Sequence, residues 1–238
     1  MKILVIADTH ISPSNVEDSE SLWYMLAQYC CIKAKPDVIV HLGDVADFNS
    51  QAWRVASRGV NTFEEEMEAV DRAVSNFNKV FEGYNRVQRL NHKRLYRPRL
   101  VLTLGNHDVR NGITAVAEYF ERNGWSVYDY LEPIQIDGIT FVHCAHKGLS
   151  DTVCTTAQEL VENWHSDIVV GHGHHKDYFE SFSYALDKPI FGMRCPCFMM
   201  EPSTWAVQTR NKWSLGFTEI DTESRTFIWR NLDCLYRI

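Results

Sequence analysis

The chain has 238 residues, a length that allows one domain with an insertion. Apolar residues make up 45% and charged residues 23%, which excludes disorder as the main state. The net charge of -7 disfavours a long polyanion bound over the whole surface, and seven irregularly placed cysteines disfavour a secreted disulfide framework. Residues 1–7 are too short an apolar run for a signal peptide or a membrane span, so we expect a cytoplasmic protein without membrane partners.

Five short apolar runs are each followed at once by Asp, His, Asn or Gly. The runs are 3–7, 38–42, 100–104, 139–142 and 168–170. Apolar runs without alternation are typical of strands buried on both faces. Helical patterns lie between several of them, which predicts a β-α-β chain with a central sheet. Ligands of such sheets bind beyond the carboxyl ends of the strands, so we expect the polar residues to converge there.

Three segments between these runs have the apolar spacing of helices. They are 21–33, 113–122 and about 155–164. Pro36 stops the first, and Asn123-Gly124 is a C-cap signal for the second. The third begins with Thr155-Thr156 at capping-box spacing.

An insertion spans about residues 48–98. Apolar residues spaced alternately by four and three, from Phe63 to Tyr84, predict a helix over 62–84 that begins with a capping box at Thr62 and Glu65. Gly83 is a candidate break. We expect the helix to pack on its own domain, with a homo-oligomer seam or an active-site cap as alternatives. The basic segment 86–99 favours a solvated helix end, with a nucleic-acid footprint as the alternative.

The last third of the chain predicts a β-hairpin over about 213–232 that extends a second sheet. Cys195-Pro196-Cys197 has no second cysteine pair at suitable spacing, so we interpret these residues as ordinary thiols and not as a zinc site. His41 precedes Gly43 inside a strand and is expected to be a packed core histidine.

The polar residues after the strands form a set of metal-binding groups: Asp8, His10, Asp44, Asn106, His172 and His174. Divalent cations of borderline character take this mixture of imidazole, carboxylate and amide ligands. Asp8 and His10 can point to one ion, and Asp44, placed directly after Gly43, could bridge two. Two ions about 3.5 to 4 Å apart hold the attacking and leaving oxygens of an in-line displacement at phosphorus.

The ordered motifs resemble those of the calcineurin-like metallophosphoesterases over residues 8–174. The motifs are Asp8-x-His10, Gly43-Asp44-x-x-Asp47, Gly105-Asn106-His107-Asp108, His143 and Gly171-His172-x-His174. The resemblance implies a four-layer αββα sandwich with two mixed β-sheets, formed here as a single domain over 1–238 with the helical insertion. It also implies two divalent metal ions, with Mn²⁺ preferred and Fe, Zn or Ni as alternatives.

The resemblance assigns the site residues one by one. The first ion would take Asp8, His10, Asp44 and His174, and the second Asp44, Asn106, His143 and His172, with His146 as the alternative to His143. His107 would contact the phosphate and protonate the leaving oxygen, and Asp47 would orient that imidazole. Arg110 is a candidate phosphate contact, and His175 is expected to lie beside the site or at the surface.

Two departures bear on the substrate. Asp47 is followed by Phe48-Asn49, where the protein Ser/Thr phosphatase branch continues with Arg-Gly, and Asp108 stands where that branch has Glu. We therefore expect a phosphodiesterase that hydrolyses a nucleotide or nucleic-acid phosphoester by attack of a metal-bridging hydroxide. The alternatives are a phosphomonoesterase, acting on a nucleotide or a phosphoprotein, and a non-catalytic binding scaffold.

Overall fold

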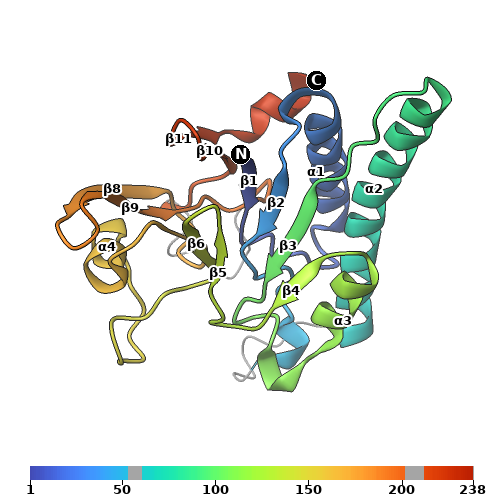
Figure 1. The fold of residues 1–238 in the computed structure, drawn as a ribbon. Helices are drawn as coiled ribbons and strands as arrows, with labels where there is room; N and C mark the ends of the chain where they lie inside the picture. Colours follow the sequence, from blue (N-terminus) through green and yellow to red (C-terminus); the bar gives the residue numbers. More distant parts are fainter. Residues whose placement is uncertain (53–60, 202–211, 238) are drawn as a thin grey trace.

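A computed structural model describes residues 1–52, 61–201 and 212–237 (Figure 1). Its first sheet has six strands in the order β11-β10-β1-β2-β3-β4. These strands are β1 (Lys2–Ile6), β2 (Val38–His41), β3 (Arg99–Thr103), β4 (Ser126–Tyr128), β10 (Phe217–Asp221) and β11 (Thr226–Arg230). Strands β1 to β4 are parallel, whereas β10 is antiparallel to both β1 and β11.

The second sheet has five strands in the order β5-β6-β7-β9-β8. Its strands are β5 (Ile134–Ile136), β6 (Ile139–Val142), β7 (Ile168–Val170), β8 (Asp177–Ser183) and β9 (Lys188–Arg194). Parallel pairs join β6 to β7 and β7 to β9, while β5 and β8 are antiparallel edge strands. Both sheets are therefore mixed.

Alternate side chains of β1 face two different hydrophobic cores. Ile3 and Val5 belong to a core shared with Phe141 and Val169 of the second sheet. Leu4 and Ile6 point the other way, into a core formed with the helices on the outer face. Because successive strand residues face opposite sides, one strand contributes to both cores.

Helices cover the outer face of each sheet (Figure 1). α1 (Val16–Tyr29), α2 (Phe63–Leu90) and α3 (Ala115–Arg122) share the core on the first sheet, and α4 (Ala157–Trp164) packs on β7 and β9 of the second. This order of layers confirms the αββα sandwich with two mixed sheets.

The helix boundaries differ from the predicted ones at several places: α2 extends to Leu90 instead of 84, and α3 begins at Ala115 instead of 113. α1 begins at Val16, before the predicted Ser21, because its first turn is mostly acidic and polar and has no apolar spacing to detect. A π-helical turn, Cys30–Ala34, continues α1 and ends where Lys35 takes a left-handed conformation with φ 45°. α4 begins as predicted, with the Thr156 hydroxyl accepting from the Glu159 amide at 3.2 Å.

α2 is one continuous helix with the predicted capping box at Thr62 and Glu65. It does not break at Gly83, which has open space around it. Val70, Val74 and Phe77 are fully buried in the core that α2 shares with α1. The apolar seam of α2 thus packs on its own chain, as predicted, and that face is not available to a second copy.

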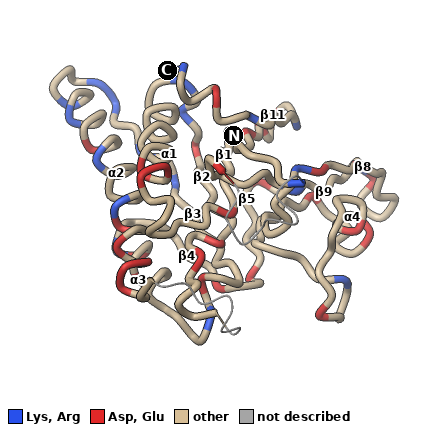
Figure 2. Tube along the Cα trace, turned by 180° about the vertical axis from the view of Figure 1, so that it is seen from behind, with Lys and Arg blue, Asp and Glu red and all other residues tan. Residues whose placement is uncertain are grey.

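The basic segment lies far from the carboxyl ends of the strands. It begins at the carboxyl end of α2 and ends at Arg99, the first residue of β3, so it lies beside the amino ends of the parallel strands. Figure 2 shows these blue residues grouped at that end of α2. A nucleic-acid footprint here would not adjoin residues placed after the strands.

The hairpin of β10 and β11 lies beside β1 in the first sheet, so the expectation that it extends the second sheet is wrong. The apolar pattern of a hairpin does not state which sheet edge it joins, since that depends on the distant partner strand. Short 3-10 helices occupy Asn49–Gln51, Arg110–Gly112 and Leu232–Arg237. Within the described ranges, no helix is both long and apolar enough to cross a membrane.

Candidate metal centre

The predicted ligands follow the carboxyl ends of strands from both sheets, and their backbone is unusual. Asp8, His10, Asp44, His172 and His174 all have positive φ, between 43° and 61°. Non-glycine residues rarely adopt this region, at a cost of roughly 1–3 kcal/mol each. Five such residues in one place indicate that the loops are shaped for the position of their side chains.

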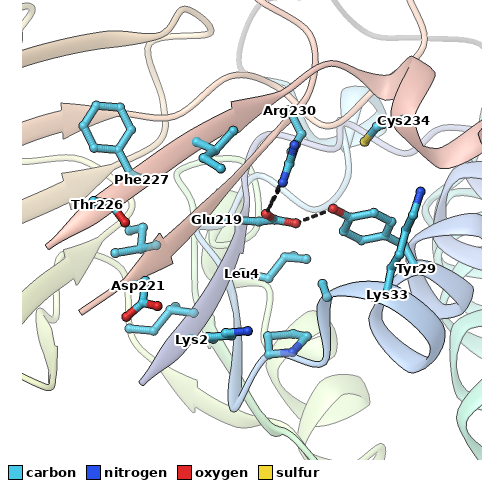
Figure 3. A pocket seen from close by; sticks show the side chains of 15 residues that line it. Lys2, Leu4, Tyr29, Lys33, Glu219, Asp221, Thr226, Phe227, Arg230 and Cys234 are labelled. Carbon is cyan, nitrogen blue, oxygen red and sulfur yellow. Dashed lines mark hydrogen bonds and ion pairs between the residues drawn. The ribbon is translucent and has the colours of Figure 1, made fainter. Parts of the chain in front are cut away.

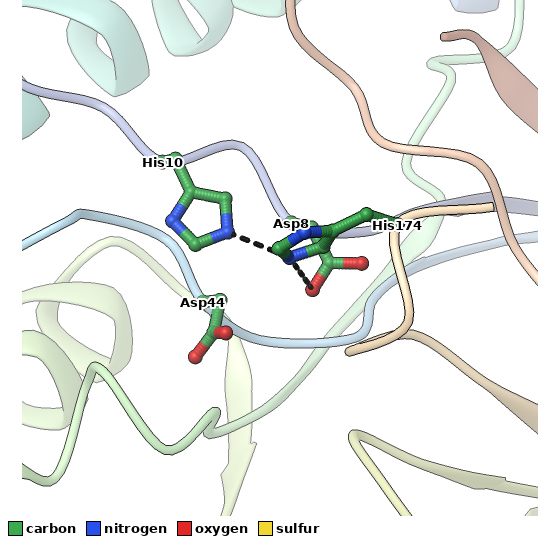
Figure 4. A group of neighbouring side chains, drawn as sticks. All are labelled: Asp8, His10, Asp44 and His174. Carbon is green, nitrogen blue, oxygen red and sulfur yellow. Dashed lines mark hydrogen bonds and ion pairs between the residues drawn. The ribbon is translucent and has the colours of Figure 1, made fainter. Parts of the chain in front are cut away.

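One group of side chains gathers around the end of β1. Ligand atoms of Asp8, His10, Asp44 and His174 all lie within 4.8 Å of one another (Figure 4). His10 Nε2 is 3.1 Å from His174 Nε2, and His174 Nε2 is 3.9 Å from Asp8 Oδ1. The two acids and His10 are buried, and His174 is nearly so. These are the four residues predicted for the first ion.

A second group adjoins the first through Asp44. Ligand atoms of Asp44, His143 and His172 lie within 4.8 Å of one another. His143 Nε2 is 3.1 Å from Asn106 Oδ1 and 3.2 Å from His172 Nδ1. Asp44 Oδ2 is 3.4 Å from His143 Nε2. The structure therefore brings together the four residues predicted for the second ion, with one carboxylate common to both groups.

The donor chemistry of the two groups fits divalent cations. His143 Nδ1 lies 2.5 Å from the Leu42 carbonyl oxygen and must donate to it, which leaves a lone pair on Nε2 facing other acceptors. His10 Nδ1 lies 2.8 Å from an Asp47 carboxylate oxygen, so in its neutral form the ring presents a lone pair on Nε2 to His174. Asp8 Oδ2 is buried without a hydrogen-bond partner. Acceptors facing acceptors in a buried space are stabilised by a cation between them.

The electrostatics point the same way. Burial alone would lower the pKa of His10, but its hydrogen bond to Asp47 and the nearby carboxylates raise the pKa to about 9. Burial opposes the shift of His143 too, yet the charge of Asp44 raises its pKa to about 9. Burial raises the pKa of Asp8 to about 6. Without metal, protons on the two histidines supply the positive charge that the carboxylates require.

His107 lies beside this centre and is held by neutral and cationic partners. Its Nδ1 donates to the backbone carbonyl of Asp47 at 2.9 Å, and Arg110 Nη2 donates to its Nε2 at 2.8 Å. Arg110 Nη1 donates to the same Asp47 carbonyl at 2.8 Å. Burial lowers the pKa of His107 to about 4. The imidazole is therefore neutral with its proton on Nδ1.

Asp47 is placed differently from the expectation. Its carboxylate was expected to orient His107, whereas the structure places that carboxylate on His10 Nδ1 and gives His107 the backbone carbonyl. Motif spacing does not say which group of Asp47 contacts which histidine, because the loop after β2 that carries Asp47 lies next to both His10 and His107. The Asp47 carboxylate contacts a predicted ligand directly. It also lies within 4.8 Å of His107, which is hydrogen-bonded to the Asp47 main chain.

Asp108 ties two motif loops together, a role that sequence reasoning did not assign. Its carboxylate accepts from the Val45 amide at 2.9 Å and from the Gly105 amide at 2.8 Å. Its burial raises its pKa to about 7. The loop after β2 and the loop after β3 are thereby held in contact behind Asp44.

The remaining candidates have other surroundings. His146 forms a β-bridge with Val153 and does not belong to the groups found among the described residues. His41 is a fully buried core histidine, as predicted, and accepts from the Gly43 amide at 3.0 Å. His175 Nε2 accepts from Arg194 at 2.7 Å. Cys195 and Cys197 are buried free thiols.

A separate cavity of about 470 Å³ lies between β1, β10, β11 and the end of α1 (Figure 3). Inside it the Tyr29 hydroxyl donates to Glu219 at 2.6 Å, and Arg230 donates to the same carboxylate at 2.9 Å. These groups satisfy one another, and the proposed metal ligands do not line the cavity. The chemistry of the chain is therefore located at the strand ends.

Comparison with known proteins identifies the family of the chain. The family model of the calcineurin-like phosphoesterases matches residues 1–196. The chain belongs to this family. It is a metal-dependent phosphoester hydrolase, and the family implies a dinuclear divalent metal site, for which the two Asp/His groups are suited. Asp8 and His174 both lie inside the matched range.

No curated protein matches the chain. Among solved structures it is similar to the nuclease MPE of Pseudomonas putida, at 16% identity over 85% of this chain and 78% of that chain, with a TM-score of 0.43. The assignment of this phosphoesterase depends on the family match and the geometry of its own residues.

Proposed function

We propose that this phosphoesterase is a phosphodiesterase acting on nucleotide or nucleic-acid phosphoesters, with two divalent ions, Mn²⁺ preferred. Asp8, His10, Asp44 and His174 would hold one ion, and Asp44, Asn106, His143 and His172 the other. The observation that carries the proposal is the buried Asp44 carboxylate at the junction of two groups of lone-pair donors. We further propose that residues 1–238 form one domain and act in the cytoplasm.

The bound ions would activate water and draw in the phosphate, since two dications exceed the charge of the two carboxylates. The chain's own residues supply the rest. Arg110 presents a guanidinium beside His107, and a substrate phosphate would accept hydrogen bonds from it. With Nδ1 bonded to the Asp47 carbonyl, His107 Nε2 is the atom that would face the leaving oxygen, and it would have to take up a proton before it could donate one.

The preference for a diester is supported by the position after Asp47. Phe48 stands where the protein phosphatase branch has its arginine, and its ring is fully buried against Phe63, 5.5 Å away between centroids. A buried apolar ring offers no donor to the extra charge of a phosphomonoester. The lack of a cation at this one position favours a substrate phosphate with a single negative charge.

A paired assay tests the proposal. The Mn²⁺-loaded protein should hydrolyse bis-p-nitrophenyl phosphate with a higher kcat/KM than p-nitrophenyl phosphate. A clear preference for the monoester would replace the proposal with the phosphomonoesterase alternative. No turnover of either ester with Mn, Fe, Zn or Ni would favour the scaffold.

A pair of histidine variants tests the catalytic assignment. His107→Ala should abolish turnover while leaving metal content unchanged. The control is His92→Asn, at an exposed left-handed position after α2, which should keep full activity. Unchanged turnover of the His107 variant under saturating metal would show that His107 takes no part in the reaction.

A further inference from the structure

Trp213 lies against the metal-centre histidines, although it comes from beyond the range that the family model matches. Its ring centroid is 4.0 Å from that of His174 and 6.3 Å from that of His10. The backbone beside it is fixed, because the Ser214 amide donates to the His174 carbonyl at 2.9 Å and the Cys197 amide donates to the Ser214 carbonyl at 2.9 Å. A broad aromatic ring is thus held at a set position beside the centre.

An indole is not needed to orient the neighbouring imidazole of His10. That ring already has its Nδ1 hydrogen bond to the Asp47 carboxylate at 2.8 Å, and its backbone is bonded to the Asp44 carbonyl at 3.1 Å. Trp213 is only partly buried, so part of its surface remains accessible.

The charge next to the indole is positive. Lys212 directly precedes Trp213 and its side chain is exposed. Sites for single-stranded nucleic acid combine aromatic side chains that stack on bases with basic residues along the backbone path. His107 and Trp213 both lie close to His10, with ring centroids 4.9 Å and 6.3 Å from it. A phosphate beside His107 and a base on the indole would thus both lie close to His10.

We propose that Trp213 stacks on the nucleobase adjoining the scissile phosphate, so that the substrate class of this centre is nucleoside phosphodiesters. The inference rests on the proposed phosphodiesterase function and adds what the enzyme recognises beyond phosphate. Trp213 is a specificity-determining residue in this view, and the base it binds belongs to a dinucleotide or to a nucleic-acid single strand.

The test compares two diesters with the same leaving group, thymidine 5′-(p-nitrophenyl phosphate) and methyl p-nitrophenyl phosphate. The proteins are the Mn²⁺-loaded full chain, Trp213→Leu and Trp213→Phe. The matched control is Trp229→Leu on β11, whose ring packs on Phe227. Base stacking on an aromatic side chain predicts that Trp213→Leu raises KM for the thymidine diester about five- to a hundredfold. Trp213→Phe should retain most of the affinity.

KM for the methyl diester, metal content and the control variant should not change. Equal losses on both diesters, or a fall in metal content, would show that the indole only supports His174 and would overturn the proposal. Unchanged KM for the thymidine diester in Trp213→Leu would do the same. Two natural esters then distinguish the ligands, and either result supports stacking. If Trp213→Leu loses affinity only for a thymidylate oligonucleotide, the ligand is a nucleic-acid single strand. If it loses as much affinity for a thymidine dinucleotide, the ligand is the dinucleotide.

Failure of the proposed phosphodiesterase function would be visible separately, as wild-type protein that hydrolyses neither diester. In that event calorimetric binding of thymidine 5′-monophosphate and methyl phosphate decides the inference. Stacking predicts that Trp213→Leu weakens the first ligand and leaves the second unchanged. An unchanged ratio of the two affinities overturns the role of Trp213 whatever the enzyme hydrolyses.

Discussion

Gly105 should not tolerate a side chain at the centre. A Cβ atom added there would lie closer than 3.0 Å to the backbone nitrogen and the carboxylate of Asp44. The backbone of Gly105 has no positive φ, so an alanine would suffer from this contact and not from its own conformation. Because the obstacle is backbone as well as side chain, we expect Gly105→Ala to cost about 3 kcal/mol, the upper end for overpacking.

Gly83 provides the matched control. It lies inside α2 with nothing within 4 Å of an added Cβ, so the same substitution should stabilise by about 1 kcal/mol. At roughly 2–4 °C per kcal/mol for a chain of this size, Tm should fall by about 6–12 °C for Gly105→Ala and rise by about 2–4 °C for Gly83→Ala. Calorimetric Mn²⁺ titration should show weaker binding for Gly105→Ala alone. Unchanged Tm and Mn²⁺ affinity in that variant would refute the close approach of the two loops.

Three further predictions follow from the centre. His10 and His143 hold protons up to a pKa of about 9, and Mn²⁺ must displace these protons when it binds. The Mn²⁺ affinity should therefore rise about ten- to a hundredfold per pH unit between about pH 7 and 9. Calorimetric titrations in buffers of different ionisation enthalpy should detect the released protons, and an Mn²⁺ affinity that does not change with pH would contradict the pKa shifts. Asp47→Asn removes the carboxylate on His10 and should weaken Mn²⁺ about 10- to 100-fold by calorimetry, whereas unchanged affinity would make that contact dispensable. Arg110→Met removes the cation beside His107 and should lower kcat/KM about ten- to a hundredfold at constant metal content, which metal analysis and steady-state kinetics check together.

The strands that carry the motifs were predictable because each is buried on both faces and ends in a polar residue. β4, β5, β8 and β9 were not predicted. β5 has only three residues, and β8 has exposed residues such as Glu180 and Phe182, so neither forms an uninterrupted buried run. The sequence also could not predict which sheet the last hairpin joins, because that depends on pairing between Phe217–Asp221 and the first strand, far away in the chain.

At the centre, sequence reasoning identified the residues that the fold brings together but not all of their partners. Ligand positions follow directly from the strand ends, so their convergence needs only the topology. The partner of Asp47 depends on side-chain direction within a loop, which spacing does not fix. Trp213 has no motif around it, and only its backbone bonds to the loop of His174 reveal its position.

The arrangement of the centre is costly to the fold unless cations bind there. Left-handed backbone at Asp8 and Asp44, the acceptor oxygens of these two buried carboxylates within 4.8 Å of one another, and the Asp8 oxygen that has no hydrogen-bond partner all oppose folding. The same features are favourable once cations lie between the acceptors, because charge then compensates each exposed lone pair. The glycines admit the close approach of the loops, and the buried Asp108 holds two of them together before any ion arrives. The packing of the sandwich therefore provides the stability that offsets the unfavourable arrangement of the site, and bound divalent ions would remove that cost.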